Sequence, residues 1–242
     1  MKVSEIKTNL RFPGASPDTK SNGQALQDFF VLIALGGKRK GYFLEIGASD
    51  GKSLSNTFLL EKEFDWNGVS IDYDVRSWLS FKKNRRRSKF ILGDATALDY
   101  KKILKRVNAQ DGVLDYLQVD IEPSTNTLLA LKQIPFSDFK FRVITYETDW
   151  YDKSQGHDVA DRTRLEAREL LVSYGYELVA GDVFVNEPDK PFEDWWILPS
   201  QIDDKTVGQI RANFRHSASP FSFLASENTS QSAFRSTRSF DD

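Results

Sequence analysis

The sequence has no cysteine among its 242 residues, only one methionine and only two histidines. The absence of cysteine excludes disulfide bonds, a thiolate zinc site and a cysteine nucleophile. Positive and negative charges nearly balance, with a formal net charge of −2, so no overall field favours nucleic acid or an anionic membrane. No apolar run reaches the ~18 residues of a membrane-spanning helix, and the polar N-terminus is unlike a signal peptide. We therefore expect a soluble, cytoplasmic protein without nucleic-acid or membrane partners.

Apolar residues make up 40% of the chain, which is enough for a substantial core. We expect an N-terminal arm over residues 1–23, one α/β domain over 24–200, and a C-terminal helix with a Ser-, Asn- and Thr-rich tail over 201–242. Four phenylalanines in the tail could dock on the domain or on a partner: Phe221, Phe223, Phe234 and Phe240.

Predicted strands and helices alternate along the domain, as in a sheet of mainly parallel strands. The pattern predicts strands at 42–46, 69–72, 89–92, 113–120 and 141–147, then a hairpin of 176–180 and 183–185 about Gly181-Asp182, and a last strand at 191–198. It predicts helices at 24–35, 53–63, 75–83, 99–107, 124–133, 161–174 and 202–214. In the last strand Trp195 and Trp196 face opposite sides, so we expect one in the core and the other on a surface or a pocket wall.

A glycine-containing turn joins the first strand to the next helix. Strand, tight loop and helix form the entry of a nucleotide-binding α/β unit. A dinucleotide site favours G-x-G-x-x-G, whereas this turn has Gly47-x-x-x-Gly51 with Asp50 inside it, and that carboxylate would repel a pyrophosphate. The turn suits S-adenosylmethionine (SAM), which carries an amino-acid end, a sulfonium and a ribose but no phosphate. The alternative is a tight turn without a ligand.

Acidic residues end the later parallel strands, where ligands of such sheets lie. Asp72, about 20 residues after the glycine turn, could accept both ribose hydroxyls. We prefer Asp72 to Asp74 because it ends the strand; the alternative is an acid that caps the following helix. Asp94 ends the next strand and could accept from an adenine amino group.

Three further carboxylates are candidates for chemistry. Asp120 and Glu122 follow the fourth strand two residues apart, so continued strand geometry would point both the same way. Glu147 ends the fifth strand. Such carboxylates can serve as a general base, as ligands of a divalent metal, or as a helix cap and a solvated neighbour. His157 is a further candidate for the base.

Several segments together resemble the FkbM-like family of class I SAM-dependent methyltransferases. The similarity extends over about residues 20–200 and is carried by 22–24, 41–51, 55–57, 60–61, 66–68, 115–122, 143–147 and 192–196. The resemblance implies a Rossmann-like α/β fold, with a seven-stranded, mostly parallel sheet, an antiparallel last strand and helices on both faces. It also implies methylation of hydroxyl oxygens on sugars or natural products.

This layout gives the expected site residues. We expect cofactor contacts from Glu45, Gly47, Ala48, Asp50, Gly51, Ser55, Asn56, Asp72, Asp94 and Asp120, and catalysis by Asp120, Glu122, Glu147 or His157. The chain departs from the family at three positions. Asp72 stands where many relatives have Glu, Pro123 replaces a glycine, and Thr148 stands where a histidine often follows the strand-five acid. If that histidine is the base in relatives, this chain must use another group or be inactive.

Two other functions are compatible with the sequence. One is a nucleotide-dependent oxidoreductase on a similar sheet, against which Asp50 and the missing third glycine count. The other is a non-catalytic SAM-binding or scaffold protein whose tail docks partners. For an enzyme, the resemblance implies a small-molecule or glycan acceptor. The sequence does not name this acceptor, but Trp150, Tyr151 and Trp196 would suit stacking on a sugar face.

Overall fold

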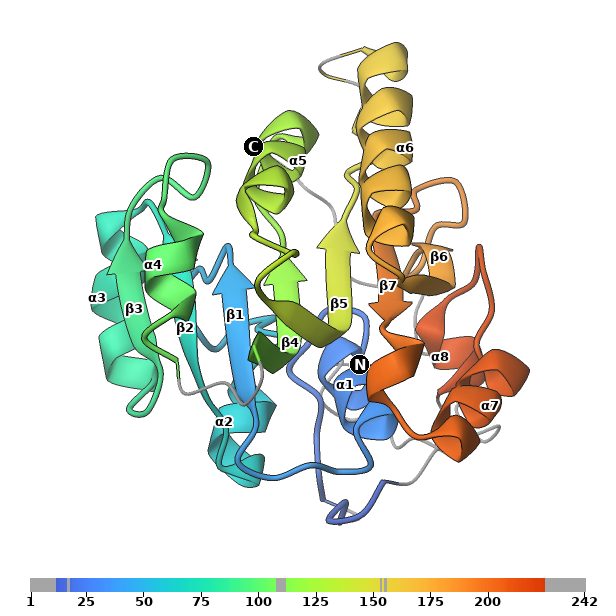
Figure 1. Cartoon of the computed structure of the whole chain (residues 1–242), viewed down its shortest axis with the longest axis horizontal. Helices are drawn as coiled ribbons and strands as arrows, with labels where there is room; N and C mark the ends of the chain where they lie inside the picture. The colour runs from blue at the N-terminus through green and yellow to red at the C-terminus, as the bar shows by residue number, and fades with distance from the viewer. Residues whose placement is uncertain (1–11, 17, 108–111, 153, 155, 225–242) are drawn as a thin grey trace.

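The computed structural model describes residues 12–16, 18–107, 112–152, 154 and 156–224. Its centre is a seven-stranded sheet in the order β3-β2-β1-β4-β5-β7-β6 (Figure 1). Neighbouring strands from β3 to β5 are parallel, and β7 is antiparallel to both of its neighbours. This confirms the predicted fold class. The strands are β1 (Tyr42–Ile46), β2 (Asn67–Asp72), β3 (Lys89–Leu92), β4 (Val113–Val119), β5 (Lys140–Glu147), β6 (Glu177–Val183) and β7 (Glu193–Ile197).

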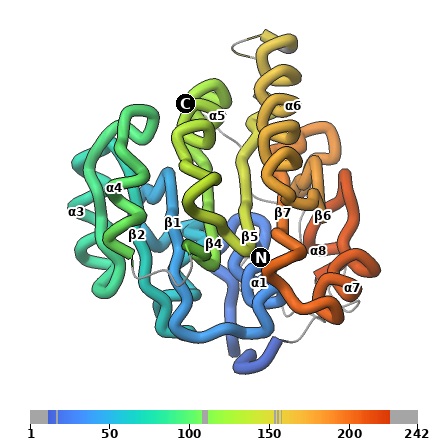
Figure 2. Tube along the Cα trace, viewed as in Figure 1, coloured from blue at the N-terminus to red at the C-terminus, as the bar shows by residue number. Residues whose placement is uncertain are grey.

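Helices cover both faces of the sheet. They are α1 (Gln27–Ala34), α2 (Phe58–Phe64), α3 (Val75–Asn84), α4 (Tyr100–Leu104), α5 (Ser124–Gln133), α6 (His157–Ser173), α7 (Asp204–Asn213) and α8 (Pro220–Phe223), with a short 3-10 turn, η3 (Pro199–Gln201). Side chains of α1, α2 and α7 pack on one face, and those of α4, α5 and α6 on the other. In Figure 2, α7 and α8 lie on the β6–β7 side of the molecule. Among the described residues, no helix is long and apolar enough to cross a membrane.

The alternation of side chains along the strands sorts the core into two layers. Phe43 and Trp195 belong to the layer with α1, whereas Leu44 and Trp196 belong to the layer with α5. The two tryptophans therefore do face opposite sides. The expectation that one of them lies on a surface or a pocket wall is wrong, because both are essentially inaccessible.

The predicted hairpin about Gly181-Asp182 is also wrong. These two residues continue the single strand β6, where Asp182 has a positive φ and the register with β7 shifts. Such an irregularity lets an extra residue stand in a strand without ending it. The hairpin is formed instead by β6 and β7, which pair antiparallel. Within β6, the Gly181 amide donates to His216 Nδ1 over 2.9 Å.

The helix after the glycine turn begins later than predicted. Ser55 Oγ accepts from the amides of Thr57 (3.3 Å) and Phe58 (3.2 Å), which holds this stretch as a turn before α2. Serine and threonine commonly compete with helix formation in this way.

Parts of both predicted appendages pack on the domain. In the arm, the ring of Phe12 lies 5.6 Å from that of Phe29 and 5.8 Å from that of Phe64, between centroids. In the tail, Phe221 and Phe223 pack against the layer that contains α1. Phe234 and Phe240 lie outside the described residues.

Candidate functional site

A cavity of about 730 Å³ opens where the parallel strands end. Among the described residues, its wall contains five carboxylates and no lysine or arginine, so its electrostatic character is negative. The lining residues come from the ends of β1 to β4 and the segments that follow: Gly47, Ser49, Ile71, Asp72, Tyr73, Asp74, Ser77, Gly93, Asp94, Ala95, Thr96, Asp120, Ile121, Glu122 and Asn126. A pyrophosphate would find no cationic partner here.

Gly47 lies in this wall because β1 and β4 approach closely at their ends. It has a φ of 90°, and a Cβ built on it would lie 1.6 Å from the carbonyl oxygen of Asp120. Gly51 does not line the cavity. A Cβ there would lie 2.3 Å from the Phe81 ring, at a φ of 70°, so Gly51 permits the turn to pack on α3.

The residues around the turn form a buried support rather than a cavity wall. Glu45 accepts from Thr57 Oγ1 (2.7 Å), Ser55 Oγ (3.3 Å) and Ser70 Oγ (2.5 Å). Burial raises the pKa of Glu45, although Arg85 and these hydroxyls oppose the shift. The polar groups of Glu45 and Ser55 are therefore used within the protein.

Three further predicted contacts also lie outside the cavity wall. Ala48 and Asn56 are buried and are not among its lining residues. Asp50 accepts from the amides of Lys52 (2.8 Å) and Ser53 (2.7 Å). Partial burial raises the pKa of Asp50, but these hydrogen bonds outweigh it, so its pKa lies below the usual value. Asp50 stabilises the turn as a charged acceptor.

Asp72 and Asp94 both line the cavity, as predicted from their strand ends. Asp72 accepts from the Ser49 amide (2.8 Å) and, through its other oxygen, from the Asp74 amide (2.9 Å), so both oxygens are fixed in orientation. Asp74 caps α3 by accepting from the Arg76 amide over 2.8 Å. The capping alternative therefore describes Asp74. Asp94 accepts from the Thr96 amide and hydroxyl, which lowers its pKa.

Asp120 connects the cavity to a buried acidic cluster. The strand β4 ends at Val119, so strand geometry does not continue through Asp120 and Glu122, but both residues line the cavity. Gln118 Nε2 donates to Asp120 over 3.3 Å, and Glu147 shares a hydrogen bond with Asp120. Burial raises the pKa of both acids, and the Asp120 charge raises that of Glu147 further. Two carboxylates in contact repel each other, so the pair is more stable when it retains one shared proton.

Asp149 is a member of this cluster that the sequence analysis did not select. It is 3% exposed, and no N–H or hydroxyl group of the described residues donates to its oxygens; its neighbour there is the Glu147 carboxyl group. Burial, followed by the charges of Asp120 and Glu122, raises the pKa of Asp149 to about 7. The signal was present in the sequence, because Asp149 follows Glu147 at the same spacing as Glu122 follows Asp120.

Two predictions remain, His157 as a candidate base and a divalent metal as a candidate cofactor. His157 is the first residue of α6, and its side chain is outside what the structure describes, so its role stays a prediction. Within the described part of the chain, no group of three or more His, Cys, Asp or Glu side chains has a geometry that could hold a metal ion.

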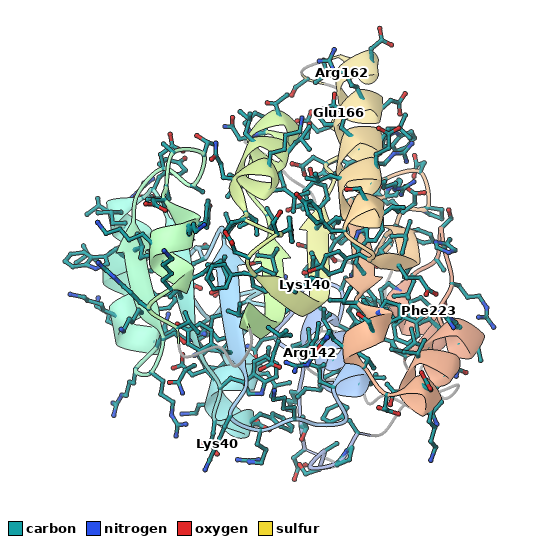
Figure 3. All side chains as sticks on the ribbon, viewed as in Figure 1. Lys40, Lys140, Arg142, Arg162, Glu166 and Phe223 are labelled. Carbon is teal, nitrogen blue, oxygen red and sulfur yellow. The ribbon has the colours of Figure 1, made fainter. Side chains whose placement is uncertain are left out.

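A second cavity, of about 410 Å³, lies at the opposite end of the strands and has the opposite charge. Lys38, Lys40 and Arg142 line it together with Asp115, which accepts from Lys38 Nζ (2.6 Å) and Arg142 (2.7 Å). Figure 3 shows Lys40 and Arg142 at this lower end of the sheet, away from Arg162 and Glu166 on α6.

No protein-family model matches the sequence, and no curated protein matches it. Solved structures do show similarity. A Methanococcus jannaschii fibrillarin pre-rRNA processing protein is 17% identical, with a TM-score of 0.44 over 72% of this chain and 76% of that one. A TehB-like SAM-dependent methyltransferase from Corynebacterium glutamicum is 15% identical, with a TM-score of 0.41 over 71% and 86%. A SAM-dependent methyltransferase from Thiobacillus denitrificans, in complex with S-adenosyl-L-homocysteine (SAH), is 14% identical, with a TM-score of 0.38 over 65% and 66%. Because these TM-scores are low, we base the function on the cavity itself.

Proposed function

We propose that the protein is a SAM-dependent methyltransferase that methylates a hydroxyl group of a sugar, a glycan or a small natural product. The main support for the proposal is the cavity at the ends of β1 to β4, which is lined by carboxylates and by no basic side chain of the part of the chain that the structure describes. SAM has a sulfonium and an ammonium group and no phosphate, so its charge suits this wall.

The cavity residues fit the parts of such a cofactor. Asp72, with both oxygens fixed by backbone amides, would hold the ribose hydroxyls, and Asp94 would accept from the adenine amino group. Gly47 keeps the β1 turn free of a side chain. When bound, SAM supplies a methyl group activated by the sulfonium charge.

The protein's own chemical task is to orient the acceptor and to take its proton. Transfer forms an O–CH3 bond and breaks the S–CH3 bond, and the hydroxyl proton passes to a carboxylate while the sulfonium becomes a neutral sulfide. A raised pKa makes a carboxylate a better base. Asp120 and Glu147 have raised pKa values and adjoin the cavity, and Glu122 lines it.

Both alternatives are less well supported. An oxidoreductase would need a cationic partner for the dinucleotide pyrophosphate, and the described residues of this wall include none. A scaffold has no need of buried acids with raised pKa values beside a cavity, an arrangement typical of sites of chemistry. For stacking on the acceptor, Tyr151 is a candidate because it is 41% exposed, whereas Trp196 is fully buried and is withdrawn.

The test separates cofactor binding from turnover. Asp120→Asn, Glu122→Gln and Glu147→Gln each remove a charge and conserve shape. We expect the variant that lacks the base to bind SAM, by calorimetry, nearly as well as the wild type, and to transfer methyl groups to a panel of sugars ~10²–10⁴-fold more slowly.

The matched control is Asp99→Asn, which removes a capping carboxylate of α4 outside the cavity and should leave both measurements unchanged. If the wild type binds NAD and not SAM, the proposal fails. If all three amide variants transfer at the wild-type rate, the base lies elsewhere, and His157 is the next residue to change.

A further inference from the structure

The buried cluster at the ends of β4 and β5 has more acceptors than donors. No N–H or hydroxyl group of the described residues donates to the carboxylate oxygens of Asp149 or to Oε1 of Gln118, although these side chains are 3% and 2% exposed, and the neighbour of Asp149 is another acid, Glu147. Gln118 is held against the cluster by its bond to Asp120. Buried acceptors normally have a donor, so the three oxygens indicate a ligand that donates.

Other buried carboxylates in this chain have cationic or polar partners. Arg85 binds Glu61 over 2.9 Å, Arg168 binds Asp194 over 2.8 Å, and three hydroxyl groups surround Glu45. No lysine or arginine of the described residues forms an ion pair with Asp120, Glu122, Glu147 or Asp149. The nearby Arg164 is paired with Asp182 over 2.7 Å and lies 4.9 Å from the Trp150 ring centroid. The acidic cluster is therefore built without its own counter-ion.

Tyr151 adds an aromatic surface beside the cluster. Its side chain is 41% exposed, and burial, with the charges of Asp149, Glu147 and Glu122, raises its pKa, which places it in the field of these acids. Carboxylates combined with an accessible ring are a common way to bind an ammonium or guanidinium group.

We propose that the acidic cluster of Asp120, Glu147 and Asp149, with Gln118 and Tyr151, binds a positively charged nitrogen of the methyl acceptor. The acceptor is then a hydroxyl compound that carries a protonated amine, such as an amino sugar. This inference rests on the proposed methyl transfer to a hydroxyl group.

SAM is a second source of an ammonium group. We assign the cluster to the acceptor because Asp149 and Glu147 do not line the cavity, and the cofactor contacts proposed above come from the β1, β2 and β3 ends. The two assignments differ in what a change at Asp149 does to SAH binding.

The experiment measures binding, by calorimetry at pH 7.5, to protein saturated with SAH. The probes are glucosamine and glucose, which are alike except that one carbon carries an ammonium group in the first and a hydroxyl group in the second. We expect glucosamine to bind at least roughly tenfold more tightly, and Asp149→Asn to remove this difference while SAH affinity is unchanged. The matched control is Glu166→Gln, an exposed carboxylate on α6 that pairs with Lys132 and does not belong to the acidic cluster.

Three outcomes would overturn the inference. Equal affinity of the wild type for both probes shows that charge is not recognised. A preference for glucosamine that survives in Asp149→Asn places recognition elsewhere. Loss of SAH affinity in Asp149→Asn assigns the cluster to the cofactor. The same titrations without SAH keep this test separate from that of the proposed function. If the protein binds glucosamine but neither SAM nor SAH, the proposed function is refuted and the inference about the acidic cluster is not.

Discussion

At the scale of single residues, Asp72 shows how a strand end prepares a ligand contact. Backbone amides of Ser49 and Asp74 hold its two oxygens in place, and each oxygen keeps lone pairs for a further donor. A carboxylate fixed in this way loses little side-chain entropy on binding, which favours a tight contact.

We predict that Asp72→Ala weakens SAM binding roughly tenfold or more, because a hydrogen bond to a charged group is worth about 1.5–3 kcal/mol. Calorimetry with SAM and SAH measures the effect. Asp99→Ala removes an acid that also accepts from a backbone amide but lies outside the cavity, so it is the matched control. Unchanged SAM affinity in Asp72→Ala would remove this residue from the site.

Asp149 links the acidic cluster to stability. Its pKa rises from the ordinary 3.8 to about 7 in the folded protein, so folding favours the protonated form. The stability that this group contributes is therefore complete below pH 3.8 and is lost as the pH rises to about 7. Above that pH the folded protein holds a buried charge at a net cost.

We predict that Asp149→Asn melts several degrees higher than the wild type at pH 8, and that this difference shrinks steadily as the pH falls towards 5. Each kcal/mol moves the melting temperature by about 2–4 °C in a protein of this size. Differential scanning calorimetry across this pH range provides the measurement. If the difference in melting temperature between the two proteins did not depend on pH, Asp149 would not change its protonation state over this pH range, and the prediction would be wrong.

At the scale of elements, the turn between β1 and α2 depends on close backbone packing. Gly47 allows β1 to meet the end of β4, and Gly51 allows the turn to meet α3. Both residues have positive φ, where a Cβ adds strain. Gly47 thus shapes the wall of the site and Gly51 the packing of the turn on α3, whether or not a ligand touches them.

We predict that Gly47→Ala lowers the melting temperature by about 6–12 °C without any ligand, because overpacking and strain together amount to roughly 3 kcal/mol. The control is Gly208→Ala, at a helical position in α7 with nothing within 4 Å of the new Cβ, which should stabilise the protein slightly. Loss of SAM binding in Gly47→Ala at an unchanged melting temperature would instead identify Gly47 as a ligand contact.

At the scale of the whole molecule, the last helices complete one face of the sheet. Phe214, just after α7, packs on Phe30 of α1 and Trp195 of β7, with ring centroids 5.4 Å and 6.1 Å away. Phe223 of α8 lies 5.2 Å from Phe214. This aromatic contact joins the C-terminal elements to α1, far from them in sequence.

We predict that Phe214→Ala lowers the free energy of unfolding by about 3–5 kcal/mol, because it leaves a cavity among buried rings. Phe223→Ala should have a smaller effect, since Phe223 is only partly buried. Chemical denaturation measures both. SAM affinity below the melting transition should not change; a fall would show that this layer also shapes the cavity at the strand ends.

The fold was more predictable from the sequence than the site. The alternation of apolar strands and helices predicted the parallel strands. The position of acids at strand ends predicted that Asp72, Asp94, Asp120 and Glu122 lie in the cavity wall. The sequence did not show that Glu45 points away from the cavity. Neighbouring side chains of a strand point to opposite faces of the sheet, but this alternation does not tell which helices cover each face.

Two errors have a common physical origin in pairing between distant segments. Gly181-Asp182 has the composition of a turn, but β7 pairs along both sides of it and keeps one strand. The partners of Asp149 likewise depend on strand order and on segments far apart in the chain, so its burial without a donor could not be predicted from local pattern.

The two oppositely charged cavities also affect how ligands meet the protein. The chain as a whole is almost neutral, yet Lys38, Lys40 and Arg142 lie at one end of the strands and the carboxylates of the other cavity at the opposite end, so the two cavities have local fields of opposite sign. We expect the acidic cavity to attract a cation that diffuses close to it, and dissolved salt to weaken this attraction. A protein whose net charge is close to zero can therefore still attract a cationic ligand to one cavity and speed its binding.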